Sequence, residues 1–123
     1  VDKANVFRSQ AFFRKIFDER KIKFKDIDAD NCYVDAMALN LIRNPWEYDV
    51  MVMENMFGDI LSDQAGGILG SLGLMPSACI GPEKAYYEPS HGSAPDIAGK
   101  NIANPYSMIG SVAMIYLEGL SLS

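Results

Sequence analysis

The chain has 123 residues, 49% of them hydrophobic and 22% charged, which is typical of a globular protein with room for one modest core. A formal net charge of −5 and the lack of a basic run argue against nucleic acid as the main partner. Cys32 and Cys79 form no CxxC motif or disulfide framework, which fits a reducing compartment. Residues 102–122 are apolar, but polar residues and a proline interrupt them, so we expect no membrane span.

Two helices are predicted in the first third of the chain. Apolar residues recur at helical spacing over residues 6–20, and the charged stretch 21–30 that follows is typical of a loop. A second helix is predicted over residues 36–43, with Asp35 as its N-cap and Asn44-Pro45 as its end. This helix is apolar almost all round, so we expect other elements or a second subunit to cover it.

Residues 48–53 form a short apolar run rich in β-formers, which predicts a buried strand. Helical spacing resumes over residues 56–70 and ends among glycines, which either permit close helix approach or terminate the helix. Asp59 and Asp63 stand at i and i+4 on one face of this helix. Their repulsion of roughly a few tenths of a kcal/mol would be reversed by Mg²⁺ or Mn²⁺, which prefer hard oxygen ligands. The alternative is a solvated acidic face.

From residue 74 onward the sequence is loop-like, with a short strand predicted over residues 85–88. Residues 89–100 are small, polar and irregular, and they include the chain's single histidine. The last helix is predicted to begin with Asn104 as its cap and Pro105 at its first position.

The loop at residues 91–96 has the residue types of a polar-ligand site. Gly92 permits close backbone approach, Ser93 and free amides can bind phosphate, and Asp96 can accept both hydroxyls of a ribose. A turn-rich surface loop is the competing interpretation. Because there is no GxGxxG motif and no Walker loop, a nucleotide site here would be of another kind.

Four stretches taken together resemble the isocitrate/isopropylmalate dehydrogenase family of β-hydroxyacid oxidative decarboxylases, most closely its isopropylmalate branch. They are VDKANV at residues 1–6, YVD at 33–35, ENMFGDILSD at 54–63 and HGSAPDIAGK at 91–100. The resemblance implies an α/β fold in which strands alternate with helices, including dimerisation helices. Residues 1–73 would be part of the substrate and dimerisation domain, and residues 74–123 the returning part of the NAD-binding domain.

The resemblance also implies a role for particular residues. Asp59 and Asp63 match the family's metal-binding aspartates, with Asp35 supplied by the neighbouring subunit as a metal ligand and catalytic residue. Lys3 matches the family's catalytic lysine, which works in proton transfer and also comes from the neighbour. The cofactor-binding positions carried over are Asn5, Glu88, His91, Gly92, Ser93, Ala94, Asp96, Ile97 and Asn104. An Asp at position 96 suits NAD, since the 2′-phosphate of NADP would meet a like charge.

The implied activity is an NAD-dependent, Mg²⁺- or Mn²⁺-assisted oxidative decarboxylation of 3-isopropylmalate to 2-oxoisocaproate in leucine biosynthesis. The enzyme would be a cytoplasmic homodimer with shared active sites, or would lie in an organelle matrix in a eukaryote, with no nucleic-acid or membrane partner. Tartrate or D-malate, homoisocitrate and isocitrate are alternative substrates, although His-Gly-Ser at residues 91–93 favours a substrate other than isocitrate. A non-catalytic dimerisation or regulatory module is the alternative from another class.

Two departures and the missing upstream part qualify the match. Ser90 stands where the family usually has Val, and Gln64 where an acid is common; neither is a metal or catalytic position. The chain opens without Met, and the family's substrate-binding arginines and the lysine's partner tyrosine would lie upstream of Val1. We therefore expect about a third of a longer enzyme, inactive as this piece alone.

Overall fold

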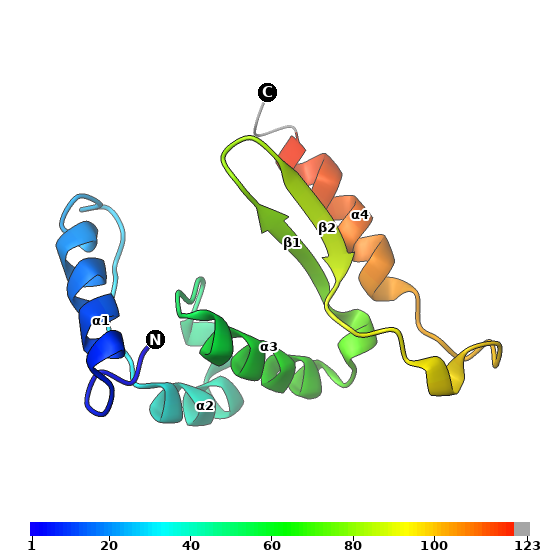
Figure 1. The fold of residues 1–123 in the computed structure, drawn as a ribbon, viewed down its shortest axis with the longest axis horizontal. Helices are drawn as coiled ribbons and strands as arrows, with labels where there is room; N and C mark the ends of the chain where they lie inside the picture. Colours follow the sequence, from blue (N-terminus) through cyan, green and yellow to red (C-terminus); the bar gives the residue numbers. More distant parts are fainter. Residues whose placement is uncertain (120–123) are drawn as a thin grey trace. The chain divides into compact units, whose positions relative to one another are not determined.

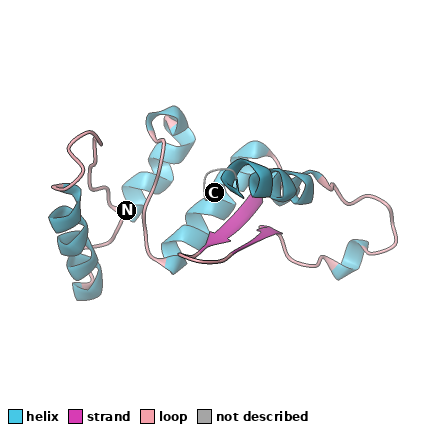
Figure 2. Cartoon of the chain, turned by 90° about the horizontal axis from the view of Figure 1, so that it is seen from above, coloured by secondary structure: helices cyan, strands magenta, loops and turns pink. Residues whose placement is uncertain are grey.

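The computed structural model describes residues 1–119 and divides into two compact units, Val1–Ala65 and a second that begins at Gly66. Helices and a two-stranded sheet make up the described chain (Figures 1 and 2), which confirms the α/β class. The division falls inside α3, Asn55–Leu69. The assignment of residues 1–73 and 74–123 to two domains of a longer protein stays a prediction. No helix among the described residues combines the length and the apolar character needed to cross a bilayer.

The first helix, α1 (Arg8–Lys21), closely follows the predicted range. It begins two residues late because the preceding segment turns first: the Val6 and Phe7 amides both donate to the Lys3 carbonyl at 3.0 Å. Arg20 and Lys21 occupy its last turn, where positive charge complements the helix dipole. The following segment is loop, as predicted.

The second helix, α2 (Val34–Arg43), begins before the predicted start, and the assignment of Asp35 as its N-cap is wrong. Tyr33 is the N-cap, and Asp35 lies in the first helical turn. Its carboxylate still faces a favourable dipole there, but the side chain is free to pair with a residue outside the helix. Asn44 ends the helix as predicted, and a short 3-10 helix, η1 (Pro45–Glu47), follows.

The core of the first unit is a small cluster built from α2 and α3. Met37, Leu41 and Leu61 are buried, and Val1, Cys32, Val34, Ala38, Tyr48, Met51 and Met53 pack around them. The Gln64 side-chain amide adds a hydrogen bond to the Ala38 carbonyl at 2.5 Å. Leu39 and Ile42, on the remaining faces of α2, are 53% and 64% exposed within this chain. Within this unit, therefore, the helix is covered on one side only.

The predicted strand at residues 48–53 does not form. Met51 and Met53 pack on the core while Val50 and Val52 are exposed, so the side chains alternate between core and solvent instead of being buried throughout. A strand also needs a neighbouring strand to pair with, and within the described chain the two strands β1 (Pro76–Ile80) and β2 (Ala85–Pro89) pair only with each other. One contact holds the segment from the side: the Val1 nitrogen donates to the Val52 carbonyl at 2.7 Å.

The end of α3 shows both proposed uses of glycine. Gly70 adopts φ +103, a left-handed conformation that terminates the helix. Gly66 lies against the short 3-10 helix η2 (Leu72–Leu74), where an added Cβ would come within 3.0 Å of Leu72 Cδ2. Termination and close approach therefore apply to different glycines of the same run.

The second unit is a β-hairpin packed against α4 (Tyr106–Gly119), as both views show (Figures 1 and 2). Strand β2 (Ala85–Pro89) matches the predicted strand, whereas β1 (Pro76–Ile80) was predicted to be loop. The strands pair antiparallel from Pro76 opposite Pro89 to Ile80 opposite Ala85. Gly110 lets α4 approach β1, because a Cβ there would lie 3.1 Å from Pro76 Cβ.

Two buried serines join α4 to the hairpin and the residue before it through hydrogen bonds. Ser107 and Ser111 are 0% and 1% exposed. Ser111 Oγ donates to the Glu88 carbonyl at 2.9 Å and accepts from the Ser77 amide at 3.3 Å, while the Ser107 hydroxyl donates to the Met75 carbonyl. These bonds satisfy polar groups that packing would otherwise leave without a partner.

Candidate active-site residues

Lys3 and Asp35, which the sequence predicts to act together, form an ion pair within the chain. The backbone explains the contact. The Asp2 amide donates to the Cys32 carbonyl at 3.0 Å, and the Val34 amide donates to the Asp2 carbonyl at 2.8 Å, which makes a parallel bridge between Asp2 and Tyr33. The next residue on one side is Lys3, and Asp35 follows closely on the other. The hydrogen bond from Lys3 lowers the pKa of the Asp35 carboxyl.

A second ion pair, which the sequence reasoning missed, lies directly beside the first. Asp2 is 1% exposed, and Arg14 of α1 binds it with two nitrogens, Nε to Oδ2 and Nη2 to Oδ1, each at 2.8 Å. Burial raises the pKa of Asp2, but the hydrogen bonds from Arg14 and from the Ala4 amide outweigh that effect, so the pKa is lowered overall. The Arg14 guanidinium also stacks over the Tyr33 ring, 4.7 Å from its centroid.

Asp2 precedes Lys3 within the VDKANV stretch, so its position was visible in the sequence. Its partner was not, because a spacing of 12 residues to a helical arginine has no periodic signature. Asn5, the predicted cofactor residue of the same stretch, lies exposed on the turn that the Lys3 carbonyl closes.

Asp59 and Asp63 lie one turn apart on α3, and both are exposed. The Asn55 amide donates to Asp59 Oδ2 at 2.8 Å, which holds that carboxylate at the start of the helix. Two exposed carboxylates at this spacing are a suitable donor set for a hard divalent cation. Among the described residues, however, no three His, Cys, Asp or Glu side chains are grouped closely enough to hold a metal. Asp35 therefore does not complete the pair within this chain.

The predicted cofactor residues from His91 to Ile97 share one loop between β2 and α4 (yellow in Figure 1). Its side chains are exposed from His91 to Asp96, and His91 Nδ1 lies 2.8 Å from the Gly92 carbonyl oxygen. A short 3-10 helix, η3 (Pro95–Ile97), carries Asp96. Ala94, which precedes it, adopts φ 44, a left-handed conformation that is uncommon for a residue with a Cβ.

The two ends of this loop are fixed by the hairpin and α4. The Ser90 amide donates to the Met75 carbonyl at 3.1 Å, the same carbonyl that accepts from Ser107. At the other end, Asn104 Oδ1 accepts from the Tyr106 amide at 3.0 Å, so Asn104 caps α4 as predicted. Pro105 lies one residue before the first helical residue instead of at it. Glu88, the remaining predicted cofactor residue, is exposed on β2.

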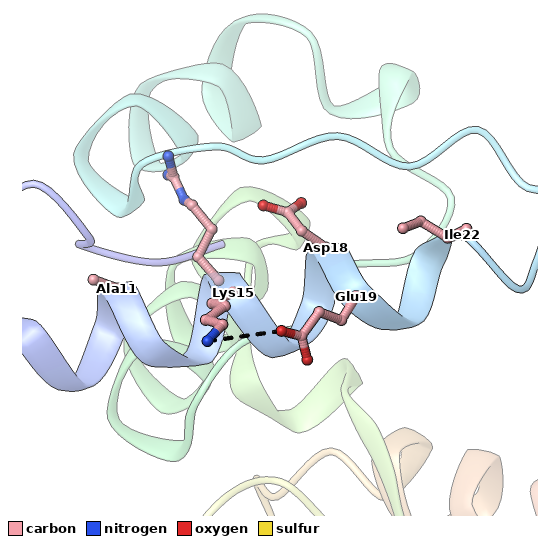
Figure 3. Close-up of a pocket in the computed structure, with 6 residues that line it drawn as sticks. Ala11, Lys15, Asp18, Glu19 and Ile22 are labelled. Carbon is pink, nitrogen blue, oxygen red and sulfur yellow. Dashed lines mark ion pairs between the residues drawn. The ribbon is translucent and has the colours of Figure 1, made fainter.

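A surface pocket lies elsewhere, along α1 (Figure 3). It is lined by Ala11, Arg14, Lys15, Asp18, Glu19 and Ile22. The figure shows the ion pair between Lys15 and Glu19, whose nitrogen and oxygen are 3.9 Å apart. None of the predicted site residues lines this pocket, so we assign it no ligand.

Comparison with known proteins gives consistent matches over the chain. The family model for isocitrate/isopropylmalate dehydrogenase matches residues 1–123. The 3-isopropylmalate dehydrogenase of Aquifex aeolicus is 54% identical over 94% of this chain and 32% of its own length. The homoisocitrate dehydrogenase of Methanocaldococcus jannaschii is 55% identical over 94% of this chain and 33% of its own length. The chain thus spans about a third of the length of these relatives.

Solved structures agree with the sequence matches. The isocitrate dehydrogenase of Methylococcus capsulatus superposes with a TM-score of 0.92 at 44% identity, covering 98% of this chain and 36% of that one. A β-decarboxylating dehydrogenase of Thermococcus kodakarensis gives a TM-score of 0.83 at 47% identity, covering 98% of this chain and 36% of its own. Sequence and structure together show that the chain belongs to the isocitrate/isopropylmalate dehydrogenase family.

Proposed function

We propose that this chain is part of an NAD-dependent, metal-assisted dehydrogenase that oxidises and decarboxylates 3-isopropylmalate to 2-oxoisocaproate, a step of leucine biosynthesis. The observation that carries the proposal is the ion pair between Lys3 and Asp35, since two segments far apart in sequence bring together the residues expected to act jointly. Relatives named 3-isopropylmalate dehydrogenase, 54% identical to the chain in two bacteria, support this substrate. We place the enzyme in the cytoplasm as a homodimer.

The metal would be Mg²⁺ or Mn²⁺, held by Asp59 and Asp63 of one subunit and by Asp35 of its neighbour. When bound, the cation would polarise the substrate's C2 hydroxyl and adjacent carboxylate and stabilise the negative charge left after CO₂ departs. The ion pair to Asp35 orients Lys3 Nζ for proton transfer. The same pair fits a site shared between subunits, because both residues would be contributed together by one chain.

The NAD would lie against the loop from His91 to Ile97, with Asn5, Glu88 and Asn104 as further contacts. Its nicotinamide would supply the hydride acceptor. Backbone amides of the exposed residues around Ser93 and the left-handed Ala94 would bind phosphate oxygens, as successive backbone N–H groups do in other anion sites. The Asp96 carboxylate would accept hydrogen bonds from a ribose and repel a 2′-phosphate.

The homoisocitrate dehydrogenase of M. jannaschii, at 55% identity, supports a second candidate substrate. A panel of 3-isopropylmalate, homoisocitrate, isocitrate, D-malate and tartrate, tested on the full-length enzyme, decides between them. We expect kcat/KM for 3-isopropylmalate to exceed the others by at least about tenfold, because D-malate and tartrate lack its apolar substituent and isocitrate and homoisocitrate carry a carboxylate there, and even one methylene in an apolar pocket is worth about tenfold or more. Homoisocitrate as the best substrate would reassign the reaction, and no turnover of any would favour a non-catalytic module.

A further inference from the structure

Asp2 is a buried carboxylate that has no role in the proposed mechanism. It is 1% exposed, whereas Asp35, Asp59 and Asp63 are exposed to solvent. A buried carboxylate is costly unless it is paired and hydrogen-bonded. Asp2 meets both conditions, because its two side-chain oxygens accept from Arg14 and from the Ala4 amide.

The geometry of the pair requires an arginine. Nε and Nη2 of Arg14 each lie 2.8 Å from a different oxygen of Asp2, which is the two-pronged contact that a planar guanidinium makes with a carboxylate. A lysine would retain the charge but could place only one nitrogen there. Such a contact fixes direction as well as distance, so it fixes the position of the backbone at Asp2 relative to α1.

Three links lead from this pair to Lys3. Lys3 directly follows Asp2, whose backbone is bonded to Cys32 and Val34 on the segment that carries Asp35. The Ala4 amide, on the far side of Lys3, donates to Asp2 Oδ1 at 2.9 Å. Lastly, the Tyr33 ring lies against both cations, with Arg14 at 4.7 Å and Lys3 Nζ at 5.9 Å from its centroid.

We propose that Asp2 and Arg14 are positioning residues that hold Lys3 Nζ against Asp35. The inference relies on the proposed function only for the role of Lys3 in proton transfer; the contact itself can be tested without turnover. Asp2 and Arg14 do not touch substrate or cofactor in this assignment. They act by fixing the backbone on both sides of Lys3.

The test measures how readily Lys3 reacts with a brief pulse of an acetylating reagent in the full-length protein without substrate. Peptide mass spectrometry gives the labelling of Lys3 relative to Lys15, whose side chain is 69% exposed on α1. In the Arg14→Lys and Asp2→Asn variants we expect this ratio to rise by about threefold to tenfold, the range that the loss of one ordinary hydrogen bond supplies. An unchanged ratio in both variants overturns the proposal.

The Leu41→Ala variant is the matched control, because it removes a buried side chain of the same unit from a core cluster that includes none of the four ion-pair residues. It is expected to lower the Tm yet leave the Lys3 ratio at the wild-type value. If it raises the ratio as much as Arg14→Lys does, general loosening explains the effect and the proposal fails. Should a single variant not fold, the Asp2→Asn/Arg14→Gln double variant leaves no buried charge unpaired and decides instead.

Kinetics give an independent readout on the same variants. A displaced Lys3 is expected to lower kcat by about tenfold to a hundredfold while KM for substrate and NAD stays within about twofold. The two proposals then fail separately. An enzyme inactive on every substrate in the panel, but with raised Lys3 labelling in Arg14→Lys, sinks the proposed function and supports the positioning role. An active enzyme whose Lys3 labelling is unchanged in both variants supports the proposed function and overturns the positioning role.

Discussion

At the scale of single residues, the two aspartates of α3 differ in what holds them. Asp59 accepts a hydrogen bond from Asn55, while Asp63 lies one turn further along the same exposed face. Replacing Asp63 by Asn removes one charge with little change of shape. We expect the Asp63→Asn enzyme to need at least about tenfold to a hundredfold more Mg²⁺ for half-maximal activity, because even the loss of a residue that only supports a metal ligand weakens metal binding by that factor.

The measurement is a Mg²⁺ titration of initial rate, with Asp49→Asn as the matched control. Asp49 is an exposed acid outside the predicted ligand set. The Asp49→Asn substitution removes the same charge from the same unit, so it separates the effect of the position of the charge from the effect of net charge. A wild-type Mg²⁺ requirement in Asp63→Asn would remove this residue from the proposed metal site.

The proposed preference for NAD is also expected to depend on a single residue. Asp96 is exposed on η3, where its charge would repel a 2′-phosphate and its oxygens would accept ribose hydroxyls. The Asp96→Lys/Ile97→Tyr variant replaces that repulsion with attraction, so its kcat/KM ratio should shift from NAD towards NADP. Steady-state kinetics with each cofactor measure the shift. Equal use of NAD and NADP by the wild-type enzyme would contradict the role of Asp96.

At the scale of elements, the four helices and strand β2 were predicted from the sequence, whereas two strand assignments, at residues 48–53 and at β1, were wrong. A helix forms its backbone hydrogen bonds within itself, so apolar spacing and residues typical of helix ends located α1 to α4 to within a few residues. A strand depends on its partner, and this explains both errors. The side chains of residues 48–53 alternate between core and solvent, but no neighbouring strand pairs with them in the described chain. Strand β1, which opens with Pro76, forms because β2 lies beside it.

The candidate site shows the same limit. Lys3 and Asp35 were identified because the VDKANV and YVD stretches that contain them resemble the family's motifs. Arg14, Ser107 and Ser111 were not, since their importance comes from burial and from partners distant along the chain. The left-handed Ala94 was missed as well, because alanine gives no hint of a positive φ.

The packing of α4 against the hairpin is expected to depend on the hydrogen bonds of Ser111. Ser111→Ala leaves the Glu88 carbonyl and the Ser77 amide short of a partner and should lower the free energy of unfolding by about 1–3 kcal/mol. Urea unfolding of the full-length protein measures this change. Ser62→Ala is the control: that serine is exposed on α3, so its loss should cost less than about 0.5 kcal/mol. Equal costs for the two serines would show that burial of Ser111 is not what matters.

At the scale of the whole molecule, the proposal is of active sites shared between two subunits. Lys3 and Asp35 pair on one chain, and Asp35 does not join Asp59 and Asp63 there in a group able to hold a metal. The partly exposed α2 offers apolar side chains for such pairing, each worth roughly 1.5–3 kcal/mol when fully buried. Lys3→Ala and Asp63→Asn homodimers should therefore both be nearly inactive.

Mixing the two inactive homodimers tests the arrangement. Each mixed dimer contains one site with both lesions and one with neither, so its activity should recover to about half that of the wild type. Native mass spectrometry confirms that subunits have exchanged. Exchange without any return of activity would mean that each subunit supplies its own Lys3, and the shared site would have to be abandoned.

The buried pair of Asp2 and Arg14 has a consequence for proton linkage. The pKa of Asp2 lies below the ordinary value of 3.8 when the protein is folded, so the unfolded chain takes up a proton there first as the pH falls. The stability that Asp2 contributes is therefore complete above pH 3.8 and is lost as the pH drops through the lower folded value. Urea unfolding at a series of pH values should show this loss in the wild type and a smaller one in Asp2→Asn. If the free energy of unfolding falls equally with pH in the wild type and in Asp2→Asn, carboxylates other than Asp2 cause the loss of stability in acid.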